Sequence, residues 1–319
     1  MGERKLTQEV VCKIKTALGT RNEVILWPGD RREALERISP GCFLPGETVL
    51  VPIMGEDSDE WAGIAERQGL EVIRLGSEWG ETVFPEDIEF LMKSINGKTV
   101  KGVLLTLHET STGVVADVEP IARTCRKRGM VCVVSAWDTL GMIELAMDRW
   151  NVDILISWMP GEICLATARK EHFARMAPGN KKADFEWPSL EAMEKTLKNS
   201  GFQKYRKMKK AIREGIQTMG LELLVKRDEI ASPVFTTVRL PEKVNGDQII
   251  DALGQKGVSG VNRLGRRESQ IIRIDHRECR DLAQILSLCG VLGMSVSSQG
   301  IPLKIQEGIN RAQEVYYSE

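Results

Sequence analysis

Thiol and imidazole groups are the first candidates for chemistry in this chain, and their number and spacing argue against a metal site. The 319 residues contain seven cysteines, an odd number, and three histidines. There is no C-x-x-C pair, whereas zinc sites and disulfide frameworks need closely or regularly spaced partners. Most of these cysteines lie in apolar segments, where a free cysteine behaves as a small core residue. We therefore expect neither a metal centre nor a disulfide framework.

Other catalytic signatures are absent as well. The sequence has no G-x-G-x-x-G loop, no Walker loop, no H-E-x-x-H pair and no G-x-S-x-G turn. It therefore lacks the common signatures of nucleotide-binding proteins, zinc proteases and serine hydrolases. Motifs alone therefore predict no activity.

A basic stretch from residue 195 to residue 213 carries eight Lys or Arg residues and no acidic residue. Nucleic-acid binding is one interpretation of such a stretch. The whole chain, however, has 44 Lys and Arg against 45 Asp and Glu, a net charge of −1, which gives no general attraction to polyanions. We expect a solvated helix face that does not bind nucleic acid.

Short β-branched runs alternate with longer amphipathic runs from about residue 21 to residue 170, which is the pattern of βα units that build a mostly parallel sheet. This α/β pattern places ligands at the carboxyl ends of the strands. The predicted strands are residues 23–27, 48–52, 71–75, 100–107, 130–135, 153–157 and 163–168. The predicted helices between them are residues 31–38, 57–68, 85–95 and 117–128.

The pattern changes after about residue 178, and we predict a large α/β domain over residues 1–180 and a small C-terminal α+β domain over residues 181–319. The second domain begins with a polar helix at residues 189–219. Its β-α-β-α order then comes from residues 234–240, 246–256, 270–275 and 281–292. No apolar run approaches the roughly 18 residues that a membrane span needs, and the charged N-terminus does not read as a signal peptide. We expect a soluble, cytoplasmic protein.

Read in order, several segments resemble the class V aminotransferases, the alanine–glyoxylate and serine–pyruvate group. The segments are NEVILWPGDRREALE, GETVLVPIMGEDSDEWAGIAERQGLEVIRL, LLTLHETSTGVVADVEPIARTCRKRGMVCVVSAWDTLG, MDRWNVDILIS and IIRIDH. The resemblance implies a fold type I transferase, with a seven-stranded sheet flanked by helices in the large domain. It also implies the cofactor pyridoxal phosphate (PLP), which the family holds as a Schiff base on a lysine.

The lysine that the family places after the strand matched by DILIS is missing. The chain reads Ser157-Trp158-Met159-Pro160-Gly161-Glu162 there, and no lysine occurs between Lys127 and Lys170. Lys170 follows the next strand, so we expect it on the side away from the pocket.

The carboxylate that would keep the pyridine nitrogen protonated is also missing. The matching strand ends in Ser135, and a hydroxyl cannot hold that proton. Asp138 lies three residues on, where a helix cap or solvated turn is the favoured interpretation.

The phosphate loop and the stacking aromatic residue depart from the family too. The phosphate position reads Pro28-Gly29-Asp30-Arg31-Arg32. Asp30 would repel a phosphate, whereas Arg31 and Arg32 could attract one or could be solvated residues of a first helical turn. The aromatic position is the acidic segment at residues 55–58, and Trp61 is expected to be a core residue.

Two features of the family are retained in this sequence. Arg273 matches the arginine that grips the substrate carboxylate, with an ion pair to Asp275 or Glu278 as the alternative. The loop that begins His108, Glu109, Thr110, Ser111 matches a loop that lines the pocket and also makes a structural turn.

Four requirements of PLP chemistry are thus not met: the lysine, the carboxylate for the pyridine nitrogen, the phosphate loop and the stacking aromatic residue. Their absence favours a homologue that has lost PLP catalysis, and we expect no catalytic residue and no bound cofactor. It would act as a subunit, scaffold or small-molecule sensor; the alternative is an active aminotransferase with atypical PLP binding. The resemblance implies a homodimer or a heterodimer with an intact paralogue, and a small carboxylate ligand. The pocket could be open beside Ser135, Ser157 and Arg273, or filled by Trp137, Trp158 and Met159.

Overall fold

The computed structural model describes residues 2–95, 97–159, 162–176, 201–263 and 270–318. These residues group into two compact units. The first unit takes its described residues from Met1–Glu78, Thr82–Glu109 and Ala116–Ser200, and the second from Trp79–Glu81, Thr110–Val115 and Gly201–Glu319. The predicted domain boundary at residues 180 and 181 lies outside the described residues.

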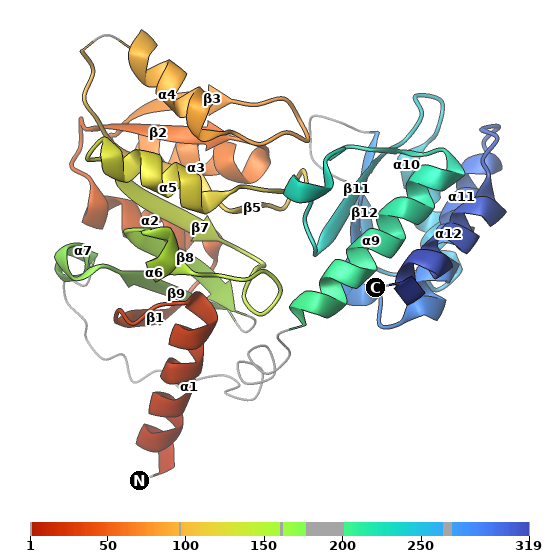
Figure 1. The fold of residues 1–319 in the computed structure, drawn as a ribbon, viewed down its shortest axis with the longest axis horizontal. Coiled ribbons are helices and arrows are strands. Elements are labelled where there is room, and N and C mark those ends of the chain that lie inside the picture. The colour runs from red at the N-terminus through yellow and green to blue at the C-terminus, as the bar shows by residue number, and fades with distance from the viewer. Residues whose placement is uncertain (1, 96, 160–161, 177–200, 264–269, 319) are drawn as a thin grey trace. The chain divides into compact units, whose positions relative to one another are not determined.

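The first unit is built on a seven-stranded sheet with the order β1-β9-β8-β7-β4-β2-β3 (Figure 1). β9 is antiparallel to both of its neighbours, and the remaining pairs are parallel. The strands are β1 (Val24–Pro28), β2 (Thr48–Ile53), β3 (Glu71–Gly76), β4 (Val100–Thr106), β7 (Val131–Ala136), β8 (Ile154–Met159) and β9 (Ile163–Ala168). The mostly parallel seven-stranded sheet that the sequence predicts is confirmed.

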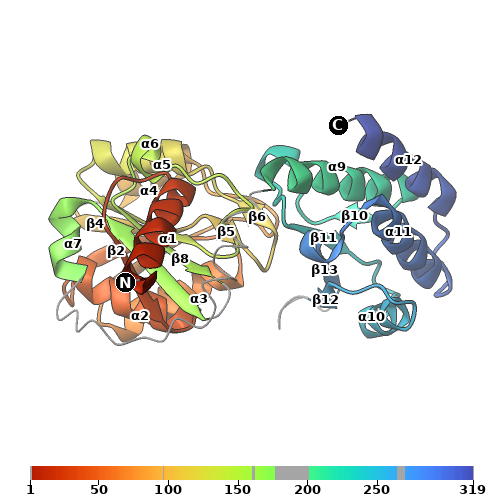
Figure 2. The same ribbon diagram turned by 90° about the horizontal axis from the view of Figure 1, so that it is seen from below.

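Helices cover both faces of this sheet. They are α1 (Gly2–Leu18), α2 (Arg31–Cys42), α3 (Glu56–Arg67), α4 (Pro85–Ser94), α5 (Val118–Lys127), α6 (Met147–Trp150) and α7 (Lys170–Met176). Figure 2 shows α4, α5 and α6 on one side of the sheet and α2 and α3 on the other. Coverage of both faces explains why the central strands are continuous apolar runs; in β2 every residue except Ile53 is buried.

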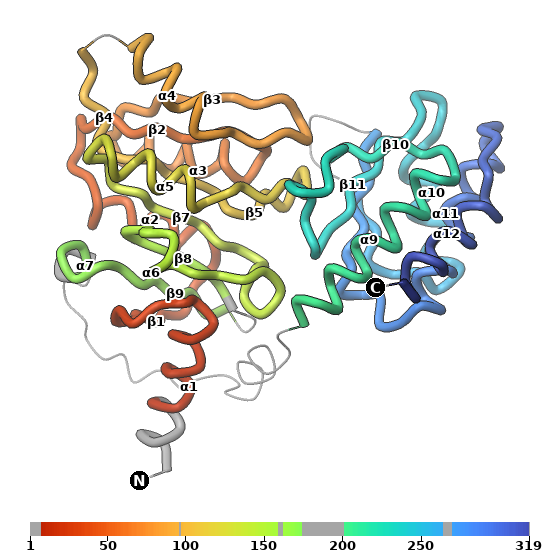
Figure 3. Tube along the Cα trace, viewed as in Figure 1, coloured from red at the N-terminus to blue at the C-terminus, as the bar shows by residue number. Residues whose placement is uncertain are grey.

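The second unit has a four-stranded antiparallel sheet with the order β10-β11-β13-β12 (Figure 2). Its helices are α9 (Phe202–Met219), α10 (Gly246–Gln255), α11 (Leu282–Ser297) and α12 (Ile305–Ser318) (Figure 3). Its strands are β10 (Glu222–Leu223), β11 (Phe235–Arg239), β12 (Val261–Arg263) and β13 (Ile271–Asp275), with 3₁₀ turns η1 (Asp228–Ile230) and η2 (His276–Glu278). This mixture of helices and antiparallel strands agrees with the α+β class predicted for the C-terminal part of the chain. The predicted helix at residues 189–219 is observed from Phe202, because residues 189–200 lie outside the described part.

Two short strands, β5 (His108–Glu109) and β6 (Val114–Val115), follow β4. β5 belongs to the first unit, whereas Thr110–Val115, which contains β6, belongs to the second. Within the described residues, no helix is both long enough and apolar enough to cross a membrane.

Candidate ligand site at the carboxyl edge of the sheet

The candidate site of the first unit is the sheet edge where β1, β2, β4, β7 and β8 end. These five strands run in the same direction, because β1 and β8 are both antiparallel to β9. The residues that follow them therefore meet at one edge, where open α/β sheets bind ligands.

The N-terminus of α2 is capped by a carboxylate of the chain itself. Asp30 Oδ1 accepts a hydrogen bond from the backbone N–H of Glu33 at 2.9 Å, and Glu33 Oε2 accepts one from the N–H of Asp30 at 3.0 Å. Gly29 allows this reciprocal cap, because a Cβ there would lie 2.6 Å from Glu33 Oε2. The cap satisfies N–H groups and brings negative charge to the end of the helix that would otherwise attract an anion.

The two arginines that follow are paired with carboxylates of α3. Arg31 Nη1 lies 2.5 Å from Asp57 Oδ1, and Arg32 Nη2 lies 3.0 Å from Glu60 Oε1. Within the described residues, Arg31 Nε is buried and has no hydrogen-bond partner. The predicted anion candidates are therefore mostly neutralised by the neighbouring helix.

Glu109 performs an equivalent role at the N-terminus of α3. The side chain is fully buried. Its Oε1 accepts a hydrogen bond from the N–H of Asp57 at 2.9 Å, and its Oε2 accepts bonds from the N–H and hydroxyl of Ser58 at 3.0 and 2.9 Å. Sequence spacing could not reveal this contact, because Glu109 and Ser58 are 51 residues apart.

The ends of β7 and β8 hold the two serines and the tryptophans. Ser135 and Ser157 are buried, and Ser157 Oγ donates to the carbonyl of Ala136 at 2.7 Å. Trp137 is 3% exposed and belongs to the core cluster with Trp61. Trp158 is partly buried against the same cluster. The side chain of Met159 lies outside the described residues.

His108 is fully buried beneath this edge, with Nδ1 3.2 Å from the carbonyl oxygen of Trp137. The contact joins the end of β4 to the end of β7. Asp138 follows Trp137 in a turn with a positive φ of 51°, a conformation that aspartate tolerates better than most residues. It is therefore a turn residue, as favoured from the sequence.

Lys170 lies at the opposite edge of the sheet. It begins α7 after β9, and the last residue of β9, Ala168, pairs with Ile154, the first residue of β8. The side chain is exposed. Its position agrees with the expectation that Lys170 lies away from the candidate site.

In the second unit, Arg273 on β13 holds the loop segment at Thr110. Arg273 Nη1 donates to the carbonyl of Thr110 at 2.9 Å, and its guanidinium lies 4.4 Å from the ring centre of Phe235. Asp275, a predicted alternative partner of Arg273, is bound by Arg277. Ser111 is buried in the same unit. The structure thus places Arg273 and Thr110 together.

The basic face of α9 is partly used inside the second unit. Asp228 accepts from Lys209 Nζ and from Arg213 Nε, each at 3.0 Å, and Lys207 lies 4.5 Å from the ring centre of Tyr316. Burial lowers the pKa of Lys209, although Asp228 opposes the shift. Lys195 and Lys198 lie outside the described residues.

Five of the seven cysteines are buried core residues, whereas Cys42 is half-buried and Cys12 is exposed. Burial raises the pKa of Cys42 and Cys164 to about 12, so both thiols stay protonated and unreactive at neutral pH. No group of three or more His, Cys, Asp or Glu side chains that could hold a metal occurs within the described ranges.

The groups of this edge do not fit PLP. The end of β7 offers the hydroxyl of Ser135 where the ring nitrogen needs a carboxylate, and Asp30 occupies the helix terminus where the phosphate needs free N–H groups. Asp57 and Glu109 add negative charge beside α3. These features oppose a cofactor whose phosphate is itself anionic.

Comparisons with known proteins agree with the fold and the resemblance. Residues 5–157 match the family model described as aminotransferase class-V. The L-aspartate–glyoxylate aminotransferase of Paracoccus denitrificans (strain Pd 1222) is 24% identical over 332 residues, which cover 93% of this chain and 84% of that protein.

Two solved structures share the fold over most of their length. The ureidoglycine–glyoxylate aminotransferase of Bacillus subtilis superposes with a TM-score of 0.85 and 23% identity, covering 98% of this chain and 90% of that one. The pyridoxamine–pyruvate aminotransferase of Mesorhizobium loti gives a TM-score of 0.86 and 20% identity, covering 98% and 89%. The chain is thus similar in sequence to the class V aminotransferases and has the fold of PLP-dependent transferases.

Proposed function

We propose that this protein has lost PLP-dependent transamination and acts as a non-catalytic homologue: a subunit, scaffold or small-molecule sensor of the class V aminotransferase family. The observation that carries the proposal is the reciprocal cap of Asp30 and Glu33. It puts a carboxylate of the chain itself at the terminus where the family binds the cofactor phosphate. The absence of lysine from residue 128 to residue 169 and the hydroxyl of Ser135 support the same conclusion.

The direct test is titration of the purified protein with PLP, followed by borohydride reduction and mass mapping. We expect no Schiff-base absorbance band and no pyridoxyl-labelled lysine. The ureidoglycine–glyoxylate aminotransferase of Bacillus subtilis, treated in parallel, is the positive control. A specifically labelled lysine, or turnover of alanine or serine with glyoxylate or pyruvate, would instead support an active aminotransferase with atypical cofactor binding.

The variant Asp30→Ser tests whether the carboxylate itself excludes the anion. Serine is also a good N-cap, so α2 keeps its start while one negative charge is removed. Like charges a few ångströms apart repel by several kcal/mol at the effective dielectric of a protein surface. We therefore expect inorganic phosphate to bind at least about tenfold more tightly to Asp30→Ser than to the parent, measured by calorimetry. Asp87→Ser on exposed α4 is the matched control, and equal phosphate affinity in all three proteins would contradict the prediction.

We further propose that the chain assembles as a homodimer or with an intact paralogue, and that Arg273 or the loop at residues 108–111 contributes to a small-carboxylate site. The family resemblance supports the assembly, and the guanidinium of Arg273 supports the ligand class. Light scattering separates monomer from dimer, and affinity capture from the native host separates the two kinds of dimer. A cytoplasmic location remains a prediction from the sequence.

A further inference from the structure

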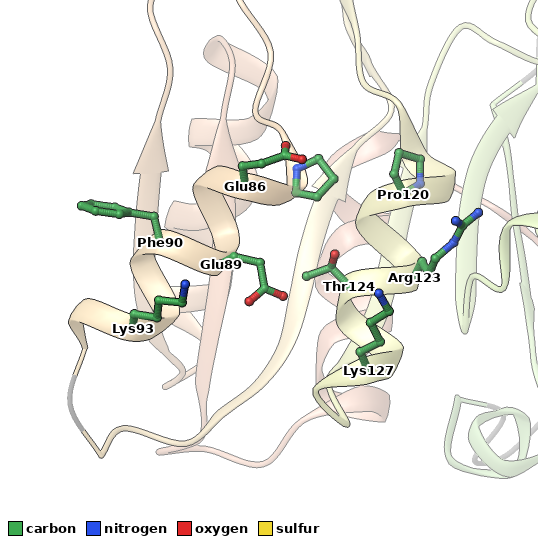
Figure 4. A pocket seen from close by; sticks show the side chains of 9 residues that line it. Glu86, Glu89, Phe90, Lys93, Pro120, Arg123, Thr124 and Lys127 are labelled. Carbon is green, nitrogen blue, oxygen red and sulfur yellow. The ribbon is translucent and has the colours of Figure 1, made fainter.

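A groove runs between α4 and α5 on the outer face of the first unit, away from the candidate site. Its volume is about 640 Å³, and all of its lining residues lie within these two helices. Pro85, Phe90 and Pro120 supply apolar surface to it. Phe90 is 76% exposed, and its ring extends from the outer side of α4, away from α5, so it forms the rim of the groove (Figure 4).

The charges along the groove are arranged unevenly. Both helices run the same way, from Glu86 to Lys93 and from Pro120 to Lys127, so their carboxyl-terminal turns lie at the same end (Figure 4). Lys93 and Lys127 are exposed there and have no ion-pair partner within the described residues. The opposite end carries Glu86. The groove is therefore basic at one end and acidic at the other.

Neighbouring ion pairs do not cancel the basic end. Glu89 extends between the helices (Figure 4), but its carboxylate is bound by Arg128, whose Nε lies 3.1 Å from Oε1. This hydrogen bond lowers the pKa of Glu89, and the charges of Lys93 and Lys127 add to the effect. Three cations and one carboxylate leave an excess of two positive charges.

We infer that this groove docks an amphipathic helix of a partner protein, with acidic residues in the first turn of that helix and a basic residue in its last turn. An antiparallel arrangement brings the acidic turn to Lys93 and Lys127 and the basic turn to Glu86. It also opposes the dipoles of the partner helix and of α4 and α5, which is favourable. An apolar stripe of the partner would cover Pro85 and Pro120, and its edge would reach Phe90 at the rim.

The dimensions agree with this mode of binding. α4 and α5 contain 10 residues each, and an α-helix rises 1.5 Å per residue, so the groove matches about three turns of a docked helix. Helices that bind in grooves use apolar anchors at i, i+3, i+4 and i+7. Lys93 and Lys127 also complement the dipoles of α4 and α5, because each lies in the last turn of its helix. That role explains the two lysines, but it does not explain why Phe90 is exposed.

Fluorescence anisotropy with the full chain and two labelled helical peptides tests the inference. One 15-residue peptide has glutamates in the first turn, leucines at i, i+3, i+4 and i+7, and lysines in the last turn. The other has the same composition with the charged ends exchanged. We expect the first peptide to bind at least about tenfold more tightly, and we expect Phe90→Ala to weaken its binding.

Charge reversal provides the decisive comparison. The double variant Lys93→Glu/Lys127→Glu should lose at least about tenfold in affinity for the first peptide, whereas Lys243→Glu/Lys256→Glu, the same charge change at exposed lysines of the second unit, should not. Circular dichroism confirms that both variants are folded. Equal affinity for the two peptides, or equal loss in both double variants, overturns the inference. Displacement of the peptide by a 15-nucleotide single-stranded DNA at equal concentration overturns it as well, because the groove would then be a general polyanion site.

Discussion

Replacement of Glu109 by alanine is expected to lower the free energy of unfolding of the first unit by about 3 kcal/mol. The buried carboxylate accepts three hydrogen bonds at the start of α3, two from backbone N–H groups and one from the hydroxyl of Ser58. Alanine leaves these donors unpaired in a buried place and removes a negative charge from a helix N-terminus. The variant also removes the hydrogen bond that Glu109 accepts from the N–H of Asp57, the residue that pairs with Arg31.

Chemical denaturation followed by circular dichroism measures this change. Glu109→Gln retains an amide oxygen as acceptor and should cost less, about 1–2 kcal/mol, because charge-assisted hydrogen bonds are stronger than neutral ones. Glu119→Ala is the matched control, since its carboxylate makes an exposed ion pair with Arg123 at 3.1 Å, a contact worth at most about 1 kcal/mol. If Glu109→Ala were no more destabilising than Glu119→Ala, the cap would contribute little to the fold.

The second unit is expected to lose about 3 kcal/mol of stability as the pH falls from 6.5 to 4, because of His276. This side chain is completely buried, with Nε2 2.8 Å from Thr236 Oγ1 and Nδ1 2.7 Å from the carbonyl oxygen of Pro233. Burial lowers the pKa of His276 to about 4, and the positive charges of Arg213 and Lys209 act in the same direction.

The direction of this pH dependence follows from the protonation of His276 in the folded and in the unfolded chain. Above pH 6.5 the imidazole is neutral in both the folded and the unfolded chain, so its full contribution to stability is present. Between pH 6.5 and 4 the unfolded chain takes up the proton while the folded chain does not, so unfolding becomes easier.

Denaturation curves recorded from pH 7 to pH 4 test this dependence by comparing the parent with His276→Asn, which cannot titrate in this range. The variant should be less stable at pH 7 but should show a smaller fall towards pH 4. The exposed carboxylates titrate equally in both proteins and cancel in the difference. Parallel pH profiles for the two proteins would show that His276 does not titrate as expected.

The secondary structure of this chain was predictable where local pattern and burial agree. Each of the seven predicted strands of the large sheet is present, with ends that differ by at most two residues. β9 reads as a strand from its apolar, β-branched run, but its antiparallel direction is not visible in the sequence, because a buried strand has the same composition in either direction. α12 is not predicted from the sequence, because this helix has only a few buried positions, Gly308, Ala312 and Val315.

The candidate site was predictable to a smaller extent. The Asp30–Glu33 pair has the spacing of a reciprocal helix cap, so the sequence carries a signal for this contact. The partner of Arg273 could not be inferred, because it is the backbone carbonyl of Thr110, 163 residues away. Main-chain acceptors have no residue type and leave no trace in a sequence.

The sequence by itself determined the α/β pattern, the resemblance to the class V aminotransferases and the absence of a lysine between Lys127 and Lys170, since these depend on residue types in order along the chain. The tertiary structure decided how the remaining polar groups are used: Glu109 caps α3, Arg31 and Arg32 meet the carboxylates of that helix, and Trp137 joins the core. Only folding brings these residues together, and burial then makes each unpaired charge or N–H group so costly that it must find a partner.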